Sequence, residues 1–203
     1  MRLPWYCSLP LLIDEFASDN IHAFFWYVSG DYPDEYPSAG IDSISVFAGL
    51  SLPAVDVNRY HIVGLGYDNI RTETIVSIIE PESLISCYAY NPLAIETKEN
   101  AYEINKKIIG RSLLSVALPI DNFSGMVDKM CELVYGQVPN SQVIMVPDGP
   151  KPLIMAMSLI PEMTKKDGVT CLHVSRNTEH YSRIDVVPRK NEIYGFQVLK
   201  SEN

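Results

Sequence analysis

The sequence lacks the features that mark several common protein classes. It has no apolar run long enough to cross a bilayer. It has no C-x-x-C pair, and its four histidines show no spacing typical of a metal site. The patterns G-x-x-x-x-G-K-[ST], H-E-x-x-H and G-x-S-x-G are also missing. These absences argue against a P-loop triphosphatase, a zinc protease of the H-E-x-x-H type and a hydrolase with the G-x-S-x-G nucleophile.

The composition indicates a globular protein with an acidic surface. Of the 203 residues, 47% are hydrophobic, which is ample for one large domain with a buried core. The formal net charge is −9 at pH 7. This charge argues against broad binding of nucleic acid or of an anionic membrane by the whole surface. An anionic ligand would therefore be held by a local group of cations.

The cysteines and the N-terminal residues favour a cytoplasmic protein. The four cysteines are far apart, and three lie in apolar segments, so we expect reduced thiols: Cys7, Cys87, Cys131 and Cys171. Arg2 precedes an apolar run over residues 3–13, an arrangement also found in signal peptides. Pro4, Pro10 and the acidic pair at residues 14–15 interrupt that run. We therefore predict a cytoplasmic location and no membrane association.

From residue 60 onward, apolar segments typical of strands alternate with segments typical of helices. The expected strands cover residues 60–64, 83–90, 112–120, 141–146 and 169–175. The expected helices cover 69–80, 99–110, about 122–135, with Asp121 or Asn122 as the cap, and 152–163. In the first helix, four isoleucines lie near one face: Ile70, Ile75, Ile78 and Ile79. The alternation predicts an α/β fold with a Rossmann-like open, mainly parallel sheet and helices on both faces.

The two ends of the chain follow a different pattern. Residues 181–203 favour an antiparallel pair of strands at a sheet edge, with a turn at 188–191. Residues 1–59 are less regular, but 21–30 and 41–50 suit two strands joined by an acidic loop that contains prolines. We therefore expect an N-terminal β-rich elaboration over residues 1–59 and a Rossmann-like α/β domain over residues 60–203. No internal repeat is present.

Polar residues follow the predicted strands, where ligands bind in open α/β sheets. The candidate ligand-binding residues are Gly64, Gly66, Asp68, Arg71, Asn91, Asp121, Asp148, Gly149, Lys151, Ser175 and Arg176. Arg71, Lys151 and Arg176 would face one crevice, because the first and fourth parallel strands of such a sheet are neighbours and the fifth lies beside the fourth. Alternatively, each arginine pairs with a nearby acid such as Glu73 or Glu179.

Two of these segments have a structural alternative. Gly64 and Gly66 begin a G-x-G-x-x-G pattern, but Asn69 occupies its last position, so a generic glycine turn is the other interpretation. In "DGPK", at residues 148–151, Asp148 would cap the following helix and a proline would begin it. The other interpretation is that the Lys151 ammonium and the amides of the turn hold one anion.

The stretch "DGPKPLIMAM" after the fourth strand resembles the G-T-K-x-M-type junction of CRISPR-associated Rossmann fold (CARF) domains and related antiviral sensor domains. The resemblance implies a regulatory or sensor module that binds a cyclic or linear oligonucleotide messenger, as a subunit of a bacterial antiviral defence assembly. It also implies that Gly149 and Lys151 contact this nucleotide-type anionic ligand. Pro150 stands where the family usually has Thr or Ser, and Asp148 where it has a small residue.

Catalytic residues are hard to find in the sequence. His61 and His173 lie in strands, where core histidines are common. In an enzyme acting on a nucleotide or its glycosidic bond, Asp68, Asp121 or His180 would serve as acid or base. A third hypothesis is a non-catalytic protein-interaction subunit that binds through its acidic surface and the aromatic run 24–27. A protein partner or a homo-oligomer is expected, no metal is indicated, and the sequence leaves the cofactor unknown.

Overall fold

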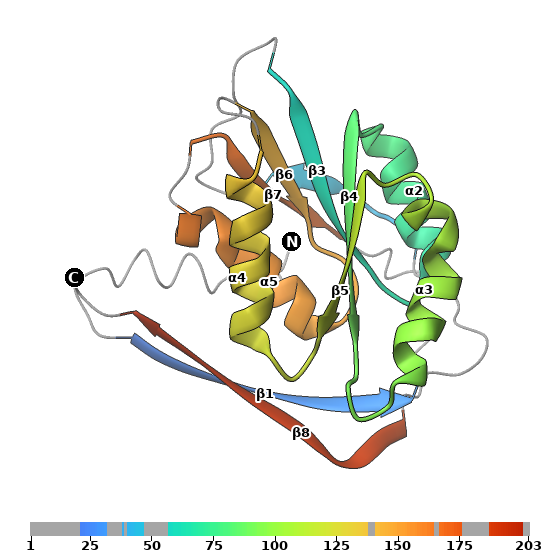
Figure 1. Ribbon diagram of the computed structural model, residues 1–203, viewed down its shortest axis with the longest axis vertical. Coiled ribbons are helices and arrows are strands. Elements are labelled where there is room, and N and C mark those ends of the chain that lie inside the picture. The colour runs from blue at the N-terminus through green and yellow to red at the C-terminus, as the bar shows by residue number, and fades with distance from the viewer. Residues whose placement is uncertain are drawn as a thin grey trace.

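The computed structural model describes residues 21–31, 38, 40–46, 57–137, 141–164, 167–175 and 187–200. Figure 1 shows their helices and strands. The strands are β1 (Ile21–Asp31), β2 (Ile44–Val46), β3 (Arg59–Leu65), β4 (Ser83–Tyr90), β5 (Leu114–Pro119), β6 (Gln142–Val146), β7 (Val169–Val174) and β8 (Val187–Lys200). The helices are α2 (Asn69–Ile79), α3 (Glu96–Ile109), α4 (Phe123–Tyr135) and α5 (Lys151–Thr164).

The main sheet has the strand order β2-β7-β6-β3-β4-β5. All pairs in it are parallel except β2 with β7, where β2 is an antiparallel edge strand. The first and fourth parallel strands, β3 and β6, are neighbours, and β7 lies beside β6, as the sequence predicted. The fold is therefore a Rossmann-like α/β fold, and the direction of winding changes between β3 and β6.

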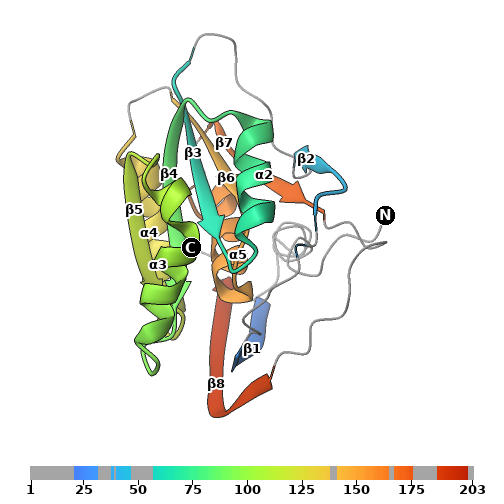
Figure 2. The ribbon, with the colours of Figure 1, turned by 90° about the vertical axis from the view of Figure 1, so that its right-hand side faces the viewer.

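Helices cover both faces of this sheet (Figures 1 and 2). Successive residues of a strand point to opposite faces of the sheet, so the sheet has a hydrophobic core on each face. Ile62 packs with α4 and α5 on one face, whereas its neighbour Val63 packs with α2 and α3 on the other. Strands that are buried on both faces must be apolar at nearly every position, which is the pattern in the sequence. Asn122 caps α4, as expected, because its side-chain oxygen accepts a hydrogen bond from the Gly125 amide at 2.9 Å.

Strands β1 and β8 form a separate antiparallel ribbon that crosses the end of the molecule where the parallel strands finish (Figure 1). The ribbon's inner face carries Phe25 and Phe196, and Phe25 packs against Met155 and Leu159 of α5. The Phe196 ring lies 4.8 Å from the Phe123 ring of α4, centroid to centroid. Helix α5 is thus covered by the sheet and the ribbon, which explains why it is apolar all round.

The ribbon differs from the predicted arrangement of the C-terminal residues. The strand β8 continues through residues 188–191, where the sequence suggested a turn, and its antiparallel partner is β1, in a sheet separate from the parallel one. Pro188 lies opposite Gly30, beside a bulge between Val28 and Gly30, a place where a strand tolerates the missing N–H of proline. Strands β1 and β2, both from residues 1–59, pair with β8 and β7. The division at residue 59 stays a prediction.

Several smaller expectations concern single residues. Cys87, Cys131 and Cys171 are free thiols, and burial raises the pKa of Cys87 to about 12, while Cys7 lies outside the described residues. His61 and His173 are buried in β3 and β7, as expected for core histidines. None of the helices in the described part of the chain has both the length and the apolar character that a membrane crossing requires.

Candidate functional site

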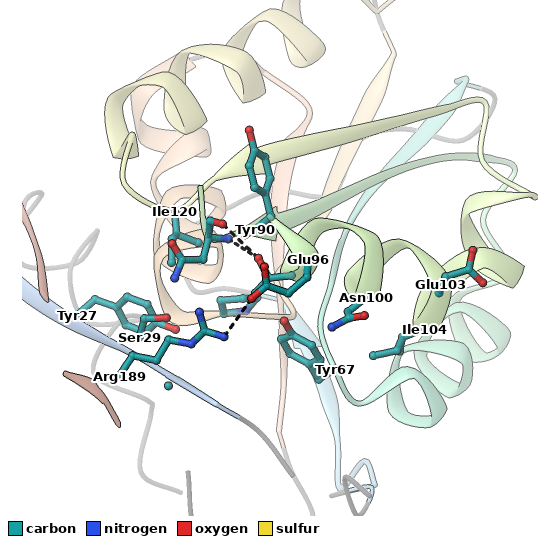
Figure 3. A pocket seen from close by; sticks show the side chains of 15 residues that line it. Tyr27, Ser29, Tyr67, Tyr90, Glu96, Asn100, Glu103, Ile104, Ile120 and Arg189 are labelled. Atoms are coloured by element: carbon teal, nitrogen blue, oxygen red, sulfur yellow. Dashed lines mark hydrogen bonds and ion pairs between the residues drawn. The ribbon is translucent and has the colours of Figure 1, made fainter. Parts of the chain in front are cut away.

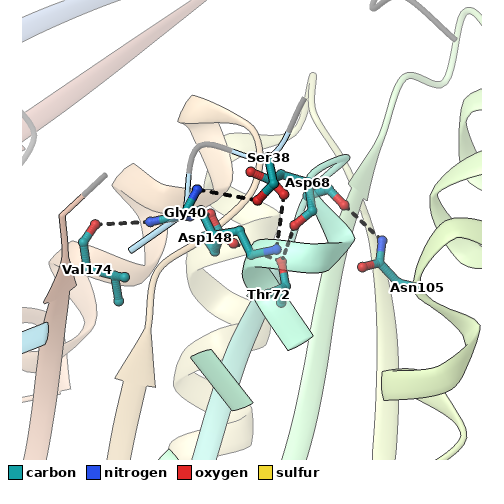
Figure 4. Close-up of polar contacts among 9 residues, drawn as sticks. Ser38, Gly40, Asp68, Thr72, Asn105, Asp148 and Val174 are labelled. Atoms are coloured by element: carbon teal, nitrogen blue, oxygen red, sulfur yellow. Dashed lines mark hydrogen bonds and ion pairs between the residues drawn. The ribbon is translucent and has the colours of Figure 1, made fainter. Parts of the chain in front are cut away.

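The carboxyl ends of the parallel strands lie at one edge of the main sheet. The part of this edge formed by β3, β6 and β7 is what we call the closed half (Figure 4). Arg71, at the start of α2, forms an ion pair with Asp148, and both side chains are almost fully buried, with exposed fractions of 3% and 5%. Thr72 donates to the other Asp148 oxygen at 2.9 Å, and Arg71 Nη2 donates to the Val174 carbonyl at 3.0 Å. We call this group the Arg71–Asp148 cluster, and it ties together α2 and the ends of β6 and β7.

The cluster changes the roles expected for three residues. Arg71 does not offer a free guanidinium to the crevice, because it pairs with Asp148, whereas Glu73 pairs with Lys107. Asp148 does not act as the cap of α5, because its two carboxylate oxygens accept from Arg71 and Thr72. Asp68 caps α2 instead, its carboxylate accepting from the Arg71 amide at 3.0 Å. The expectation that Asp148 caps α5 is therefore wrong, and the local sequence does not reveal its partner, which lies 77 residues earlier in the chain.

The glycines of the closed half allow two turns to touch. A Cβ built on Gly66 would lie 2.8 Å from the Gly149 Cα, and one built on Gly64 would collide with the Asp148 carbonyl. Gly149 also has a φ of +101°, which favours glycine. The β3–α2 and β6–α5 turns therefore meet backbone to backbone. Within the described residues, these two turns thus occupy the crevice between β3 and β6, where a Rossmann-like sheet usually binds its ligand.

The open half of the same edge lies over the ends of β4 and β5 and contains a cavity of about 340 Å³ (Figure 3). Its lining comes from strand ends, from α3 and from the ribbon: Tyr27, Ser29, Gly30, Tyr67, Ala89, Tyr90, Asn91, Glu96, Thr97, Asn100, Glu103, Ile104, Ile120, Pro150 and Arg189. Three tyrosines therefore border one space. A cavity of this size, beyond the carboxyl ends of parallel strands, is typical of a small-molecule site.

Asn91 holds the ribbon over this cavity. Its side-chain amide donates to the Glu192 carboxylate at 2.6 Å and accepts from the Tyr194 hydroxyl at 3.0 Å. Burial and the nearby Glu192 charge raise the pKa of Tyr194, so the phenol keeps the proton that it donates. Arg189 adds an ion pair to Glu96 of α3, with 3.7 Å between Nη2 and Oε1. Asn91 thus positions the wall of the cavity rather than offering a free amide to a ligand.

The remaining polar groups of the cavity suit a ligand portion that is polar but uncharged. Ser29 and Asn100 have no side-chain hydrogen bond to any described residue. The lining contains two carboxylates and one guanidinium: Arg189 pairs with Glu96, whereas Glu103 pairs with Lys106 outside the lining. The lining therefore carries no excess of cations. Tyrosine rings can stack on a planar ring, and a free amide can bond to its edge.

A second cavity, of about 240 Å³, adjoins the first at Tyr27. The described residues that line it are Phe24, Phe25, Trp26, Tyr27, Pro152, Met155, Phe196 and Lys151, and Lys151 is the only charged residue among them. Lys151 is exposed and makes no ion pair with any residue that the structure describes. It begins α5, next to Pro150 in the lining of the first cavity. An anionic group leaving the first cavity at Tyr27 would meet this ammonium.

Two other sequence candidates, Asp121 and Ser175, line neither cavity. Asp121 is exposed after β5, and Ser175 bonds to the Ser43 hydroxyl at 2.8 Å. Arg176, Glu179 and His180 lie outside the described residues, so the expectation that Arg176 faces Lys151 stays a prediction.

Sequence reasoning missed most of the cavity lining, above all Tyr27 and Arg189 of the ribbon. Tyr67 and Tyr90 could have been found, because they stand in the strand-end segments "GLGYD" and "YNP".

Comparison with known proteins adds no family assignment. No family model matches the chain, and no curated protein matches it in sequence. Among the described residues, no three His, Cys, Asp or Glu side chains are grouped so that they could hold a metal ion. The cavities and the residues that line them are therefore the features from which a function can be inferred.

Proposed function

We propose that the protein is a Rossmann-like regulatory or sensor module that binds a nucleotide-type ligand at the open half of the sheet edge. The observation that carries the proposal is the cavity of about 340 Å³ bordered by Tyr27, Tyr67 and Tyr90. Aromatic rings stack on bases of any sequence, and Asn100 can bond to a base edge. The base and sugar would occupy this cavity.

The anionic end of the ligand would lie at Lys151. The first cavity has two carboxylates and one guanidinium in its lining, so phosphate is better accommodated outside it. Lys151 lies beyond Tyr27, and the positive end of the α5 dipole adds to its charge. The ion pair with Arg71 also offsets the negative charge of Asp148, which would otherwise oppose an anion nearby. The resemblance of "DGPKPLIMAM" to the CARF junction supports the same ligand class and a place in an antiviral defence assembly.

Binding without turnover is favoured over catalysis. In the enzyme hypothesis, the acid and base groups were Asp68, Asp121 and His180. Asp68 is buried and caps α2, Asp121 is exposed and lines neither cavity, and His180 lies outside the described residues. An enzyme acting on a nucleotide or its glycosidic bond is the alternative that the experiment must separate.

The experiment is a thermal-shift screen with matched nucleosides, mononucleotides and cyclic or linear oligonucleotides, followed by chromatographic analysis of the products. We expect nucleotides to raise Tm more than their nucleosides do, because bound ligand stabilises the folded state. The Lys151→Gln variant should weaken nucleotide binding by roughly tenfold or more and leave nucleoside binding unchanged. The Tyr67→Ala variant should weaken both, since stacking is lost.

The matched control is Lys129→Gln, which removes an exposed lysine of α4; neither Lys129 nor its ion-pair partner Glu132 lines either cavity. It should bind like the unmodified chain. Binding that Tyr67→Ala and Lys151→Gln leave unchanged would place the ligand elsewhere, and no shift with any compound would reject the proposal. Appearance of a cleaved product would establish the enzyme alternative.

A further inference from the structure

One side of helix α3 supplies a row of polar side chains to the first cavity. Glu96, Asn100 and Glu103 all belong to the lining, and they stand at positions i, i+4 and i+7 of the helix. Residues at this spacing lie on one face of an α-helix. Arg189, the only cation among the described lining residues, pairs with Glu96 at one end of the row. The other end therefore offers an amide and a carboxylate whose ion-pair partner, Lys106, lies outside the lining.

The turn that carries Tyr67 is held against this other end of the row. Asn105 donates to the Gly66 carbonyl at 2.9 Å, and Asn69 donates to the Ile104 carbonyl at 3.3 Å. The two hydrogen bonds join α3 to the residues just before and after Tyr67, and Asn105 is buried. The position of Tyr67 in the cavity wall is thus fixed relative to α3.

The first cavity has one end suited to a base and another that leads to the proposed phosphate position. Figure 3 shows Tyr67, Asn100 and Glu103 toward one end and Tyr27 toward the other. Tyr27 also lines the second cavity, which contains Lys151. A nucleotide with its phosphate at Lys151 therefore extends past Tyr27 and places its base at the far end. There the base lies against the Tyr67 ring, with its edge toward α3.

A carboxylate at this edge distinguishes between the bases, because its two oxygens only accept hydrogen bonds. Guanine has two adjacent donors, N1–H and the 2-amino group, which match the two oxygens. Adenine and cytosine each have an unprotonated ring nitrogen beside the amino group, and uracil has a carbonyl on each side of its N–H. These three bases would place a lone pair opposite one carboxylate oxygen, which costs a hydrogen bond. Among the four common bases, guanine alone satisfies both oxygens.

The order of the groups on α3 also matches the edge of guanine. This edge carries O6, N1–H and the 2-amino group in a row, and Asn100 precedes Glu103 by one turn. The amide of Asn100 can donate to O6, while the Glu103 carboxylate accepts from the two neighbouring donors. The ion pair between Glu103 and Lys106 is exposed and lies within one helix, so it contributes little and does not prevent this contact.

We infer that the ligand is a guanine nucleotide, whose base stacks on Tyr67 and whose edge is recognised by Glu103 and Asn100. The inference rests on the proposed function, because it names the base of that nucleotide. Water reaches the Glu103 side chain, which limits the strength of its hydrogen bonds. We therefore expect guanosine 5′-monophosphate to bind roughly tenfold more tightly than adenosine 5′-monophosphate.

The test is titration calorimetry of the full chain with the 5′-monophosphates of guanosine, inosine and adenosine, which differ only in the base. Inosine keeps N1–H but lacks the 2-amino group, so its affinity should lie between the other two. Glu103→Gln should weaken binding of the guanosine nucleotide by roughly tenfold and leave the adenosine nucleotide bound as before. The reason is that a glutamine amide can donate to adenine N1 and accept from the adenine amino group.

The matched control is Glu99→Gln, which removes an exposed carboxylate of the same helix that lines neither cavity. It should keep the preference for guanine. A preference that Glu99→Gln also loses would overturn the inference, since net charge rather than Glu103 would then decide the affinity.

Two further outcomes separate this inference from the proposed function. If the three nucleotides bind equally, or if Glu103→Gln keeps the preference, the base assignment is overturned. The proposed function then still stands, provided that Tyr67→Ala and Lys151→Gln weaken binding. Binding of none of the three would overturn the inference, and the proposed function falls with it if no compound of the thermal-shift screen binds.

Discussion

At the closed half of the sheet edge the polar residues bond to one another, whereas at the open half they line a cavity. The Arg71–Asp148 cluster and the contact between Gly66 and Gly149 fill the place where β3 and β6 diverge. Over β4 and β5, the ribbon is attached at Asn91 and leaves about 340 Å³ beneath it. The comparison teaches that a strand-end position alone does not identify a ligand residue. The decisive property is whether another part of the fold already satisfies that residue.

The largest effect is expected from breaking the closed half. Asp148→Ala leaves the Arg71 guanidinium buried without its acid, and we expect the free energy of unfolding to fall by about 3–5 kcal/mol. The double variant Arg71→Met with Asp148→Leu should recover much of this loss, because no unpaired charge remains. Urea unfolding measures both.

A matched control is the exposed pair between Lys107 and Glu73, where Lys107→Ala should cost less than about 1 kcal/mol. If Asp148→Ala cost no more than this control, the closed half would not be held by the ion pair.

A moderate effect is expected from pH, through His173 beside the closed half and His61 near the start of β3. Burial lowers the pKa of His173, and the positive charge of Arg71 lowers it further, while burial also lowers the pKa of His61. The folded state thus binds fewer protons than the unfolded state once the pH falls below the ordinary histidine value of 6.5. Stability should be complete above that pH and should decrease as the pH falls from it toward the lower folded pKa.

The measurement is urea unfolding at about pH 7.5 and at about pH 5.5, with His173→Gln for comparison. The variant should lose less stability between the two conditions than the unmodified chain. Equal losses would show that His173 does not contribute to the acid sensitivity.

The smallest effect on stability is expected in the open half. Asn100 is exposed and has no side-chain hydrogen bond within the described residues, so Asn100→Ala should change the free energy of unfolding by less than about 0.5 kcal/mol. Under the proposed function, the same change should weaken binding of the nucleotide identified in the screen. A large loss of stability would mean that the polar residues of the open half contribute to the free energy of unfolding as those of the closed half do.

The strands and helices of the parallel sheet could be predicted from the sequence, because the patterns that mark them are local. The strands are mainly apolar, Asn122 marks the start of α4, and the strand order follows from the winding of a Rossmann-like sheet. The buried side of α2 could not be predicted in this way. Ile70 and Ile78 are exposed, at 62% and 58%, while Arg71 and Thr72 are buried because Asp148 provides their partner.

The candidate site was predictable only in part, for the same physical reason. Lys151 lines a cavity and Asn91 supports another, and both follow from their strand-end positions. Tyr27 and Arg189 come from β1 and β8, whose pairing joins residues near 21 with residues near 200. No turn or periodicity records a pairing across such a separation, so the ribbon's share of the lining has no local signal.

The same long-range pairing has a consequence during synthesis on the ribosome. Strand β1 ends at residue 31, but its partner is complete only at residue 200, which is 200 − 31 = 169 residues later. At the usual rates of translation, β1 then waits on the order of 10–30 s for its partner strand. During that interval Phe25 and Tyr27 are not yet paired with Phe196 and Tyr194 of β8.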